Sequence, residues 1–457
     1  MQIIELEVNK LYGYIDKKIN FYEDINLLVG INGAGKTSIL NILNWLLQPA
    51  VARLSVTEFN KITLKFYYKN TYYSLVCEHI KNELIYSLYS SDGEEYYPLN
   101  VPISHHPKII GNNRDIETHL MDQYKYLRPD ENEEKIWNFI HSLPNPVVIG
   151  LDRSIYAEES NGELYISNNS NINNSESSTS HDSPLDRIKK IVNMNYRRRK
   201  NSILTMTNKL KNSLMISAFD EKITKSILND KDFKLITTED INYSEAKLRK
   251  YFRNLEKEVG SGKDNIKIDR YFENLKYVVR DYENNKEDEV SEIIYKLNIN
   301  QFSKVEDLLK DFERFEKRTH SVMRKIDEYL DTLNFFLKDS SKRIVFKEDT
   351  SEIAFHTLDK QGNILLKNKD IRNLSSGEQQ ILILFSYIAF NKNEGRVFII
   401  DEPELSLHIK WQEHFLEKLN IIRPEGTQLI LATHSPILAN KMRNKAILLL
   451  PYTEEGR

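Results

Sequence analysis

The chain has 457 residues, 40% of them hydrophobic, and its 64 Lys and Arg nearly balance its 67 Asp and Glu, for a formal net charge of −3. This composition indicates a soluble globular protein with core enough for two or three subdomains, and excludes nucleic-acid binding through overall basic charge. The single cysteine, Cys77, excludes a disulfide framework and a cysteine-based zinc site. A reducing, cytoplasmic location is therefore expected, with no signal peptide and no bilayer-spanning segment.

The first predicted elements are a strand, a glycine-rich loop and a helix. An apolar run at 25–29 precedes the octapeptide GINGAGKT at 30–37, and an apolar-periodic stretch follows. In the spacing G-x-x-x-x-G-K-[ST], backbone N–H groups surround the β-phosphate, the lysine reaches the β- and γ-phosphates, and the hydroxyl completes a Mg²⁺ shell. We therefore predict a nucleoside triphosphate site with Mg²⁺ held in part by Thr37. The predicted nucleotide contacts are Asn32, Gly33, Ala34, Gly35, Lys36, Thr37 and Ser38.

An antiparallel sheet is predicted next. Residues 61–89 alternate apolar and polar residues on either side of Asn70-Thr71, which is typical of paired strands joined by a turn. Tyr12 and Tyr14 follow the first strand of the chain and are candidates to stack on a base. A packing role for these two tyrosines is the alternative.

The middle of the chain is predicted to be helical. Residues 161–184 are rich in Ser and Asn and are expected to form a flexible linker. The clearest heptad pattern runs from Phe302 to Leu337, and breaks are expected near 229–242, 260–262 and 298–300. We expect a compact bundle or a short antiparallel hairpin, with helices of about 25 to 40 residues.

Two features of this helical segment suggest contacts with nucleic acid. The run Tyr196-Arg197-Arg198-Arg199-Lys200 suits phosphate groups, with a solvated helix face or a protein interface as the alternative. The pair Arg314 and His320 resembles the ribonuclease motif of HEPN domains. Its alternative is a polar layer that sets the helix register.

Two strands near the end of the chain are predicted to deliver polar side chains to one sheet edge. The run VFII at 397–400 ends in Asp401-Glu402, and the strand 428–432 ends in Thr433-His434-Ser435. Asp401 is placed to hold Mg²⁺ through water, Glu402 is the candidate base for the attacking water, and His434 is the candidate γ-phosphate contact.

The segment NLSSGEQQ at 373–380 precedes an apolar helix. A Ser-Ser-Gly turn at a helix N-terminus is a potential anion site. Its alternative is an ordinary N-cap at Ser375 or Ser376, with Glu378 or Gln379 closing a capping box.

In this order, GINGAGKT, LSSGEQQ, VFIIDEPELSLH and ATHS resemble the motifs of ABC-type ATPases of the SMC, RecF, Rad50 and overcoming-lysogenization-defect group, over about residues 1–50 and 340–450. The resemblance implies an α/β fold: an ABC-type P-loop ATPase head with a small antiparallel β subdomain and a helical insertion. It implies ATP as the nucleotide, Glu402 as the catalytic glutamate and His434 as the switch histidine.

The same resemblance implies a dimer with composite sites. The signature residues Ser375, Ser376, Gly377 and Glu378 of one protomer would contact the nucleotide held by another, and residues 404–408 would contact the partner. Ser376 replaces a glycine of the family pattern, and Glu378 replaces a glutamine. No glutamine follows the strand 146–150, where Asp152 or Arg153 would stand near the metal.

The expected domains follow from these motifs. Residues 1–160 form the first part of the ATPase head, 161–184 the linker, 185–338 the helical insertion and 339–457 the second part of the head.

A separate effector is expected, because no Toprim carboxylate cluster follows His434 and no HNH pattern appears in the sequence. The chain resembles the ATPase subunits of the anti-phage systems PARIS, whose partner has a Toprim fold, and Septu, whose partner has an HNH fold. We expect self-association, an effector nuclease as partner, DNA or a phage protein as trigger, and no membrane. The alternative is a DNA-repair or DNA-end-binding ATPase of the RecF or Rad50 kind, and a transporter subunit is disfavoured.

Overall fold

The computed structural model describes residues 1–103, 124, 127–149, 155–156, 183–217, 235–259, 265–390, 396–405 and 407–450. The chain divides into two compact units. One comprises Met1–Met194 with Glu328–Arg457, and the other is Asn195–Asp327. Within the described ranges, no helix combines the length and apolar character needed to cross a membrane.

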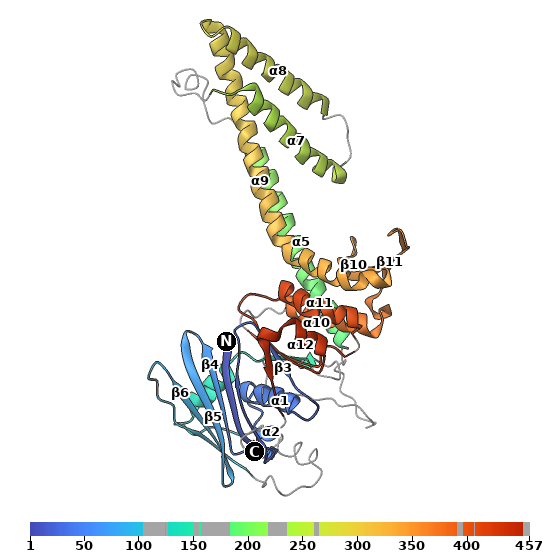
Figure 1. Ribbon diagram of the computed structural model, residues 1–457. Helices are drawn as coiled ribbons and strands as arrows, with labels where there is room; N and C mark the ends of the chain where they lie inside the picture. Colours follow the sequence, from blue (N-terminus) through green and yellow to red (C-terminus); the bar gives the residue numbers. More distant parts are fainter. Residues whose placement is uncertain are drawn as a thin grey trace, which may run out of the picture. The chain divides into compact units, whose positions relative to one another are not determined.

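The first unit is built around a six-stranded, mostly parallel sheet in the order β15-β3-β14-β13-β8-β9. Figure 1 labels β3 of this sheet. Only β9 is antiparallel to its neighbour. Every residue of β13 and β14 is buried, as expected for strands covered on both faces. The strands are β3 (Ile25–Val29), β8 (Val147–Ile149), β9 (Ile155–Tyr156), β13 (Val397–Asp401), β14 (Gln428–Thr433) and β15 (Ala446–Leu448).

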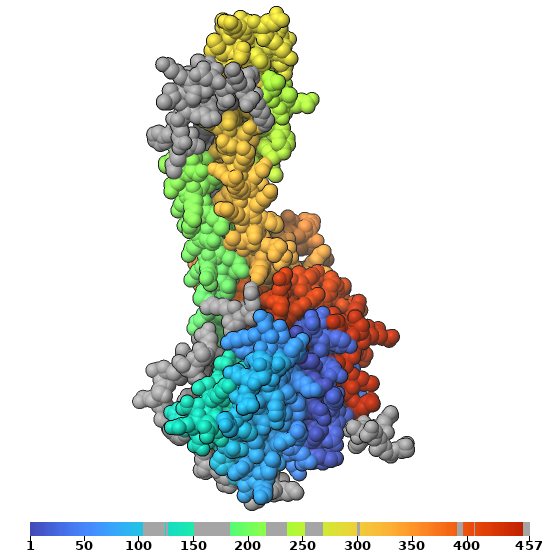
Figure 2. Space-filling model, turned by 90° about the vertical axis from the view of Figure 1, so that its left-hand side faces the viewer, coloured from blue at the N-terminus to red at the C-terminus, as the bar shows by residue number. Residues whose placement is uncertain are grey.

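A second six-stranded sheet is antiparallel, in the order β2-β1-β4-β5-β6-β7. It confirms the predicted β subdomain, since β4 and β5 pair as expected, although the turn between them is Lys69-Asn70, one residue before the predicted position, and Thr71 already pairs with Tyr68. Figure 2 shows residues 127–149 lying against this sheet, where Phe139 of α4 packs on Tyr73 with ring centroids 4.6 Å apart. The strands are β1 (Gln2–Leu11), β2 (Ile15–Asn20), β4 (Lys61–Tyr68), β5 (Thr71–Ile80), β6 (Glu83–Ser90) and β7 (Leu99–Pro102).

One hydrophobic cluster joins the two large sheets and helix α1, which gives the loop between β3 and α1 a rigid base. Buried Gln428 strengthens this connection, because its side chain accepts from the N–H of Ile3 (2.7 Å) and donates to the carbonyls of Ile3 and Tyr22 (2.8 Å each). The helices of this part are α1 (Lys36–Leu47), α2 (Val51–Val56) and α4 (Glu134–Ser142).

A third, three-stranded sheet, β10-β11-β12, precedes the signature segment and was not predicted from the sequence. Its strands are β10 (Lys342–Phe346), β11 (Ile353–Leu358) and β12 (Ile364–Lys369). The remaining helices of this unit are α10 (Ser376–Phe390), α11 (Ile409–Ile422), α12 (Pro436–Lys441) and the 3-10 turns Lys338–Ser340, Ile371–Asn373 and Arg443–Lys445.

The second unit is helical, as predicted. It contains α7 (Thr238–Val259), α8 (Asn265–Asn284) and parts of α5 (Pro184–Ser217) and α9 (Glu289–Leu337) around a core of its own. The expected break at 298–300 is wrong, because α9 runs unbroken for 49 residues, longer than the helices predicted. Asn298 fits inside the helix since its amide donates to the carbonyl of Ile294 (2.8 Å).

Candidate functional site

The phosphate loop has the predicted strand-loop-helix context: β3 ends at Val29 and α1 begins at Lys36. Gly30 is required by a close approach, since a Cβ there would lie 2.6 Å from the carbonyl oxygen of Leu449. Gly35 has a φ of 86° at the N-cap of α1, a conformation that disfavours L side chains. The first-turn N–H groups and the positive end of the helix dipole therefore stand ready for an anion.

Around this loop, Asn32, Gly33 and Thr37 are exposed and Ser38 is half-buried, so they can meet a ligand. Ala34 is 3% exposed, and its side chain packs in the core. Any contact that Ala34 makes with nucleotide therefore has to come from its backbone.

The Lys36 ammonium lies at the centre of the site. Its Nζ donates to the carbonyls of Gly30 (2.8 Å) and Ile31 (3.2 Å) and lies 3.2 Å from Nδ1 of His434. Burial lowers the pKa of Lys36, and the negative charges of Glu402, Asp401 and Glu404 oppose that shift. The ammonium is thus held beside the glycine loop by backbone carbonyls, and nearby carboxylates favour its charged form.

Thr37 and Asp401, the two residues predicted to hold Mg²⁺, lie in contact, since the Thr37 hydroxyl donates to Oδ2 of Asp401 at 2.8 Å. The other oxygen, Oδ1, is buried and has no hydrogen-bond partner among the described residues. Burial raises the pKa of Asp401, the Thr37 hydrogen bond opposes this, and the like charge of Glu402 adds to it. This set of oxygens with an orphaned carboxylate oxygen fits Mg²⁺, which prefers oxygen ligands and would relieve the unpaired charge.

His434 and Glu402 form the next link, with Nε2 of His434 3.3 Å from Oε1 of Glu402. Because Lys36 is the donor at Nδ1, we assign the ring proton to Nε2, where it points to the carboxylate. Glu402 has a φ of +47°, which is strained for a non-glycine residue. The backbone is held there by the Glu402 N–H, which donates to the carbonyl of Ala432 at 2.9 Å.

Glu404 is a functional candidate that the sequence analysis identified only as part of a dimer-contacting loop. Its Oε1 accepts from the hydroxyl of Thr433 (2.6 Å), the N–H of His434 (2.6 Å) and the N–H of Ser435 (2.9 Å). One carboxylate oxygen thus fixes the strand end that carries His434. The signal available in the sequence was the second acid of Glu402-Pro403-Glu404, directly after a buried strand.

The signature segment is a helix N-terminus, where Ser375 immediately precedes α10. Ser375 and Ser376 are exposed. Glu378 is 2% exposed; its Oε2 accepts from the Ser375 N–H (2.7 Å) and from Lys342 Nζ (2.7 Å). Glu378 therefore closes a capping box, which was the alternative to a nucleotide contact. Its carboxylate binds Ser375 and Lys342 of the same chain and is not presented to a nucleotide.

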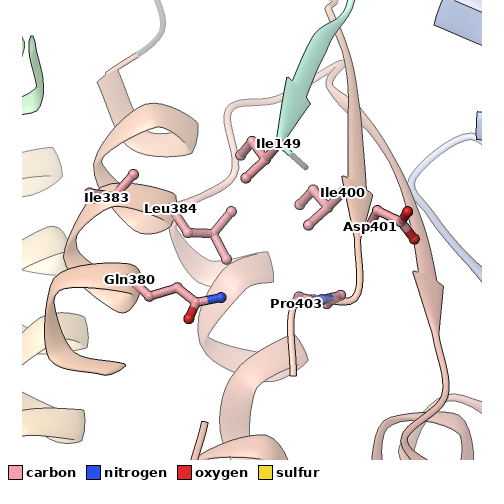
Figure 3. Close-up of a pocket in the computed structure, with 7 residues that line it drawn as sticks. All are labelled: Ile149, Gln380, Ile383, Leu384, Ile400, Asp401 and Pro403. Atoms are coloured by element: carbon pink, nitrogen blue, oxygen red, sulfur yellow. The ribbon is translucent and has the colours of Figure 1, made fainter. Parts of the chain in front are cut away.

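No hydrogen bond or ion pair between described residues joins 375–378 to Lys36, Thr37, Asp401 or His434. A small cavity of about 20 Å³, room for roughly one water molecule, separates α10 from the ends of β8 and β13. Figure 3 shows Gln380, Ile383 and Leu384 on one side of it, with the carboxylate of Asp401 turned away from them. Asp401 therefore lines this cavity, while its carboxylate reaches Thr37 of the phosphate loop.

The remaining predicted residues have varied surroundings. Tyr12 and Tyr14 are 39% and 64% exposed, which does not support a packing role; base stacking stays a prediction. Arg314 is bound to Asp311 (3.2 Å) and His320 is exposed. Asp152 and Arg153 lie outside the described residues.

Comparison with known proteins places this geometry in a family. A family model described as an AAA ATPase domain matches residues 1–439. The chain belongs to this AAA ATPase domain family. The strand-end carboxylates and phosphate loop described above lie within the matched region.

Several relatives are ATP-binding proteins by name. A putative ABC transporter ATP-binding protein of Caldanaerobacter subterraneus is 30% identical over 105 residues, 23% of this chain and 42% of that protein. The Retron Vc95 probable ATPase of Vibrio cholerae is 28% identical over 149 residues, 30% of this chain and 28% of that protein. The chain thus spans less than half the length of these two relatives.

Among solved structures, the Smc head domain of Pyrococcus furiosus with an extended coiled coil, bound to the C-terminal domain of ScpA, matches at 15% identity. The match covers 96% of this chain and 91% of that chain, with a TM-score of 0.32.

Proposed function

We propose that this chain binds ATP with Mg²⁺ and hydrolyses it at the phosphate loop. The observation that carries this proposal is the contact series from Lys36 through His434 to Glu402, which connects a phosphate-binding cation to a carboxylate base. Thr37 and Asp401 supply the oxygens suited to the metal. The metal, when bound, contributes charge neutralisation at the phosphate oxygens.

Each side chain has a defined task in this proposal. Lys36 exchanges its hydrogen bonds to loop carbonyls for the β- and γ-phosphates. Glu402 orients the attacking water and accepts its proton, while the Nε2–H of His434 holds the Glu402 carboxylate in place. Glu404 acts indirectly, by fixing the backbone that carries His434.

The second half of the site is proposed to come from another copy of the chain. Ser375, Ser376 and Gly377 sit at the N-terminus of α10, and the two serines are exposed, as an anion contact in trans requires. Dimers that share sites in this way are also compatible with assembly into larger rings.

At the level of biology, we propose an ATP-driven sensor and scaffold in a bacterial anti-phage complex that controls a separate effector nuclease. Support comes from the similarity to a probable ATPase that is named as part of a retron. The chain resembles the PARIS and Septu ATPases, whose partners have a Toprim fold and an HNH fold. The proposed effector is therefore a nuclease of one of these two folds. DNA or a phage protein would be the trigger.

The test compares the integrity of DNA and RNA after incubation with the purified chain, with and without ATP and Mg²⁺, and again with its co-purifying partner. We expect ATP hydrolysis by the chain alone and cleavage only with the partner. The contrary result is cleavage of nucleic acid by the chain alone. Cleavage that persists in Lys36→Ala and is lost in His320→Ala would support the hypothesis that Arg314 and His320 form a ribonuclease site.

A further inference from the structure

We propose that a basic surface on helices α5 and α9 binds the phosphate backbone of duplex DNA. The surface is defined by Arg198 on α5 and by Lys317, Arg318 and Lys325 on α9, with Arg197, Lys200 and Arg324 beside them. All of these residues are exposed and belong to the helical unit Asn195–Asp327. The proposal rests on the proposed function and deepens it, because it assigns duplex DNA, one of the two triggers named there, to a part of the chain remote in sequence from the phosphate loop.

Positive charge is segregated on α5. Between residues 195 and 217 this helix has no acidic residue, although the whole chain carries a net charge of −3. Its basic residues there are Arg197, Arg198, Arg199, Lys200, Lys209 and Lys211. Residues 197–200 are consecutive and lie all around the helix, and the half-buried Arg199 is turned towards α9, so Arg197, Arg198 and Lys200 carry the exposed charge. A solvated helix surface normally mixes both signs, so an exposed stretch without acidic residues indicates an anionic partner.

Helix α9 presents a matching face. At 100° per residue, Lys317, Arg318, Arg324 and Lys325 fall at i, i+1, i+7 and i+8, within one arc of about 120°. No acidic residue lies between 317 and 325, and Ile326, on the opposite side, is fully buried. The heptad spacing therefore aligns four cations along the outer side of a helix that is fixed by its core.

Direct contacts bring the two helices together in antiparallel order. Nε of Arg199 donates to the carbonyl of Val322 (3.2 Å), and the Ser213 hydroxyl donates to Asp311 (2.8 Å). Figures 1 and 2 both show α5 and α9 side by side. Val322 lies about one turn from Arg318 and from Lys325, so the basic run of α5 adjoins the basic face of α9.

Four of the cations that define this surface form no ion pair within the described ranges. They are Arg198, Lys317, Arg318 and Lys325, although the charge of Lys317 acts on Glu313 one turn before it. The pKa of Arg199 is lowered, first by partial burial and then by the like charge of Arg198, as expected where cations crowd together.

Geometry and composition favour a duplex over a single strand. The face from Lys317 to Lys325 extends about 12 Å along α9, a length over which duplex DNA carries roughly seven phosphate charges. Proteins that bind single strands stack bases on exposed aromatic rings. None of the exposed large hydrophobic residues in the described parts of 195–217 and 311–327 is aromatic.

The test measures the affinity of the full chain for a mixed-sequence DNA duplex of about 30 base pairs by fluorescence anisotropy, between about 50 and 200 mM salt. The variant carries Arg198→Gln, Arg318→Gln and Lys325→Gln. Its matched control carries Lys360→Gln, Lys367→Gln and Lys441→Gln, which remove the same charge from exposed positions of the other unit. The same-sequence single strand and an RNA duplex serve as competitors.

We expect the surface variant to lose at least about tenfold in affinity and its log–log salt slope to shrink by about 2.7, because each lost phosphate contact contributes about 0.9. The control variant should bind as the wild type does. Absence of duplex binding by the wild type, equal loss in both variants, or preference for single strand or RNA would overturn the proposal. If the triple variant does not fold, Arg198→Gln and Lys325→Gln alone should each reduce the slope by about 0.9, and unchanged slopes in both would overturn it.

ATP hydrolysis measured on the same preparations separates this proposal from the proposed function. None of the substituted residues belongs to the nucleotide site, so basal hydrolysis should persist in every variant. Duplex binding without hydrolysis would contradict the ATPase proposal alone, and hydrolysis without duplex binding would contradict this inference alone.

Discussion

At the scale of single residues, Glu404 acts through its neighbours. Three donors converge on its Oε1, so Glu404→Ala should leave the strand end at His434 without its anchor. We expect a loss of about 2 kcal/mol or more in the free energy of unfolding, and hydrolysis about 10-fold to 100-fold slower. ATP affinity should change less than hydrolysis, because Glu404 contacts His434 only at its backbone N–H and makes no hydrogen bond to Lys36 or to residues 32–35.

Phosphate release and denaturant unfolding check this prediction. Glu413→Ala, at an exposed position of α11, is the matched control and should match the wild type in both. Wild-type hydrolysis in Glu404→Ala would mean that His434 is positioned by other contacts.

A substitution of Lys36 tests whether the site binds ATP. Lys36→Ala deletes the side chain whose charge would meet the β- and γ-phosphates, so ATP affinity should fall by about 100-fold or more. Titration calorimetry measures this, with the exposed lysine variant Lys360→Ala as control. Unchanged ATP affinity in Lys36→Ala would show that the loop at 30–37 does not bind the phosphates of ATP.

At the scale of elements, the N-terminus of α10 depends on buried Glu378. Burial alone would raise its pKa, but hydrogen bonds from Lys342, Ser340 and the Ser375 N–H outweigh it, and the pKa of Glu378 is lowered. A lowered carboxylate pKa stabilises the fold above the unfolded pKa of 4.5, and this stabilisation is lost as the pH falls through the folded value.

Glu378→Gln should therefore lower the free energy of unfolding by about 1 to 3 kcal/mol at pH 7, because Lys342 loses its ion pair while the neutral amide can still accept from Ser375. Denaturant unfolding from pH 7 down to pH 3 measures the difference in the free energy of unfolding between the wild type and Glu378→Gln. This difference should decrease below about pH 4.5, because the wild-type carboxyl is then protonated. A difference that stays constant with pH would show that the ion pair with Lys342 contributes nothing.

The elements also show how far the sequence was informative. The strand-loop-helix at Lys36, the turn at Asn70 and the strand ending at Asp401 were predictable because each has a strong local signal: glycine spacing, β-branched alternation and a wholly apolar run. The sheet β10-β11-β12 and the unbroken α9 were missed, because short strands and Asn298 carry local preferences that tertiary packing overrides.

The candidate site was predictable in its residue types but not in its connections. That Lys36 would contact His434, and that Glu404 would fix His434, depends on where β14 and the segment after β13 lie in space. Glu378 shows the converse error: its motif position suggested nucleotide contact, whereas burial and Lys342 give it a structural role.

At the scale of the whole molecule, the composite site predicts complementation between two inactive chains. Lys36→Ala removes phosphate binding, and Ser375→Arg blocks the exposed end of α10. Each variant alone should be inactive. Mixed in equal amounts, they should recover about one quarter of wild-type hydrolysis, because half of randomly formed dimers contain one intact site of two. No recovery on mixing, in variants shown to be folded, would contradict a site built from two copies.

The central claim is that Glu402 performs the chemistry at a site that Lys36 and Thr37 form for ATP. Glu402→Gln is the most direct test, since it preserves the shape and removes the base. Steady-state phosphate release should fall by about 100-fold or more, while ATP affinity persists and ATP-dependent self-association becomes stable. Hydrolysis by Glu402→Gln at the wild-type rate would contradict the account.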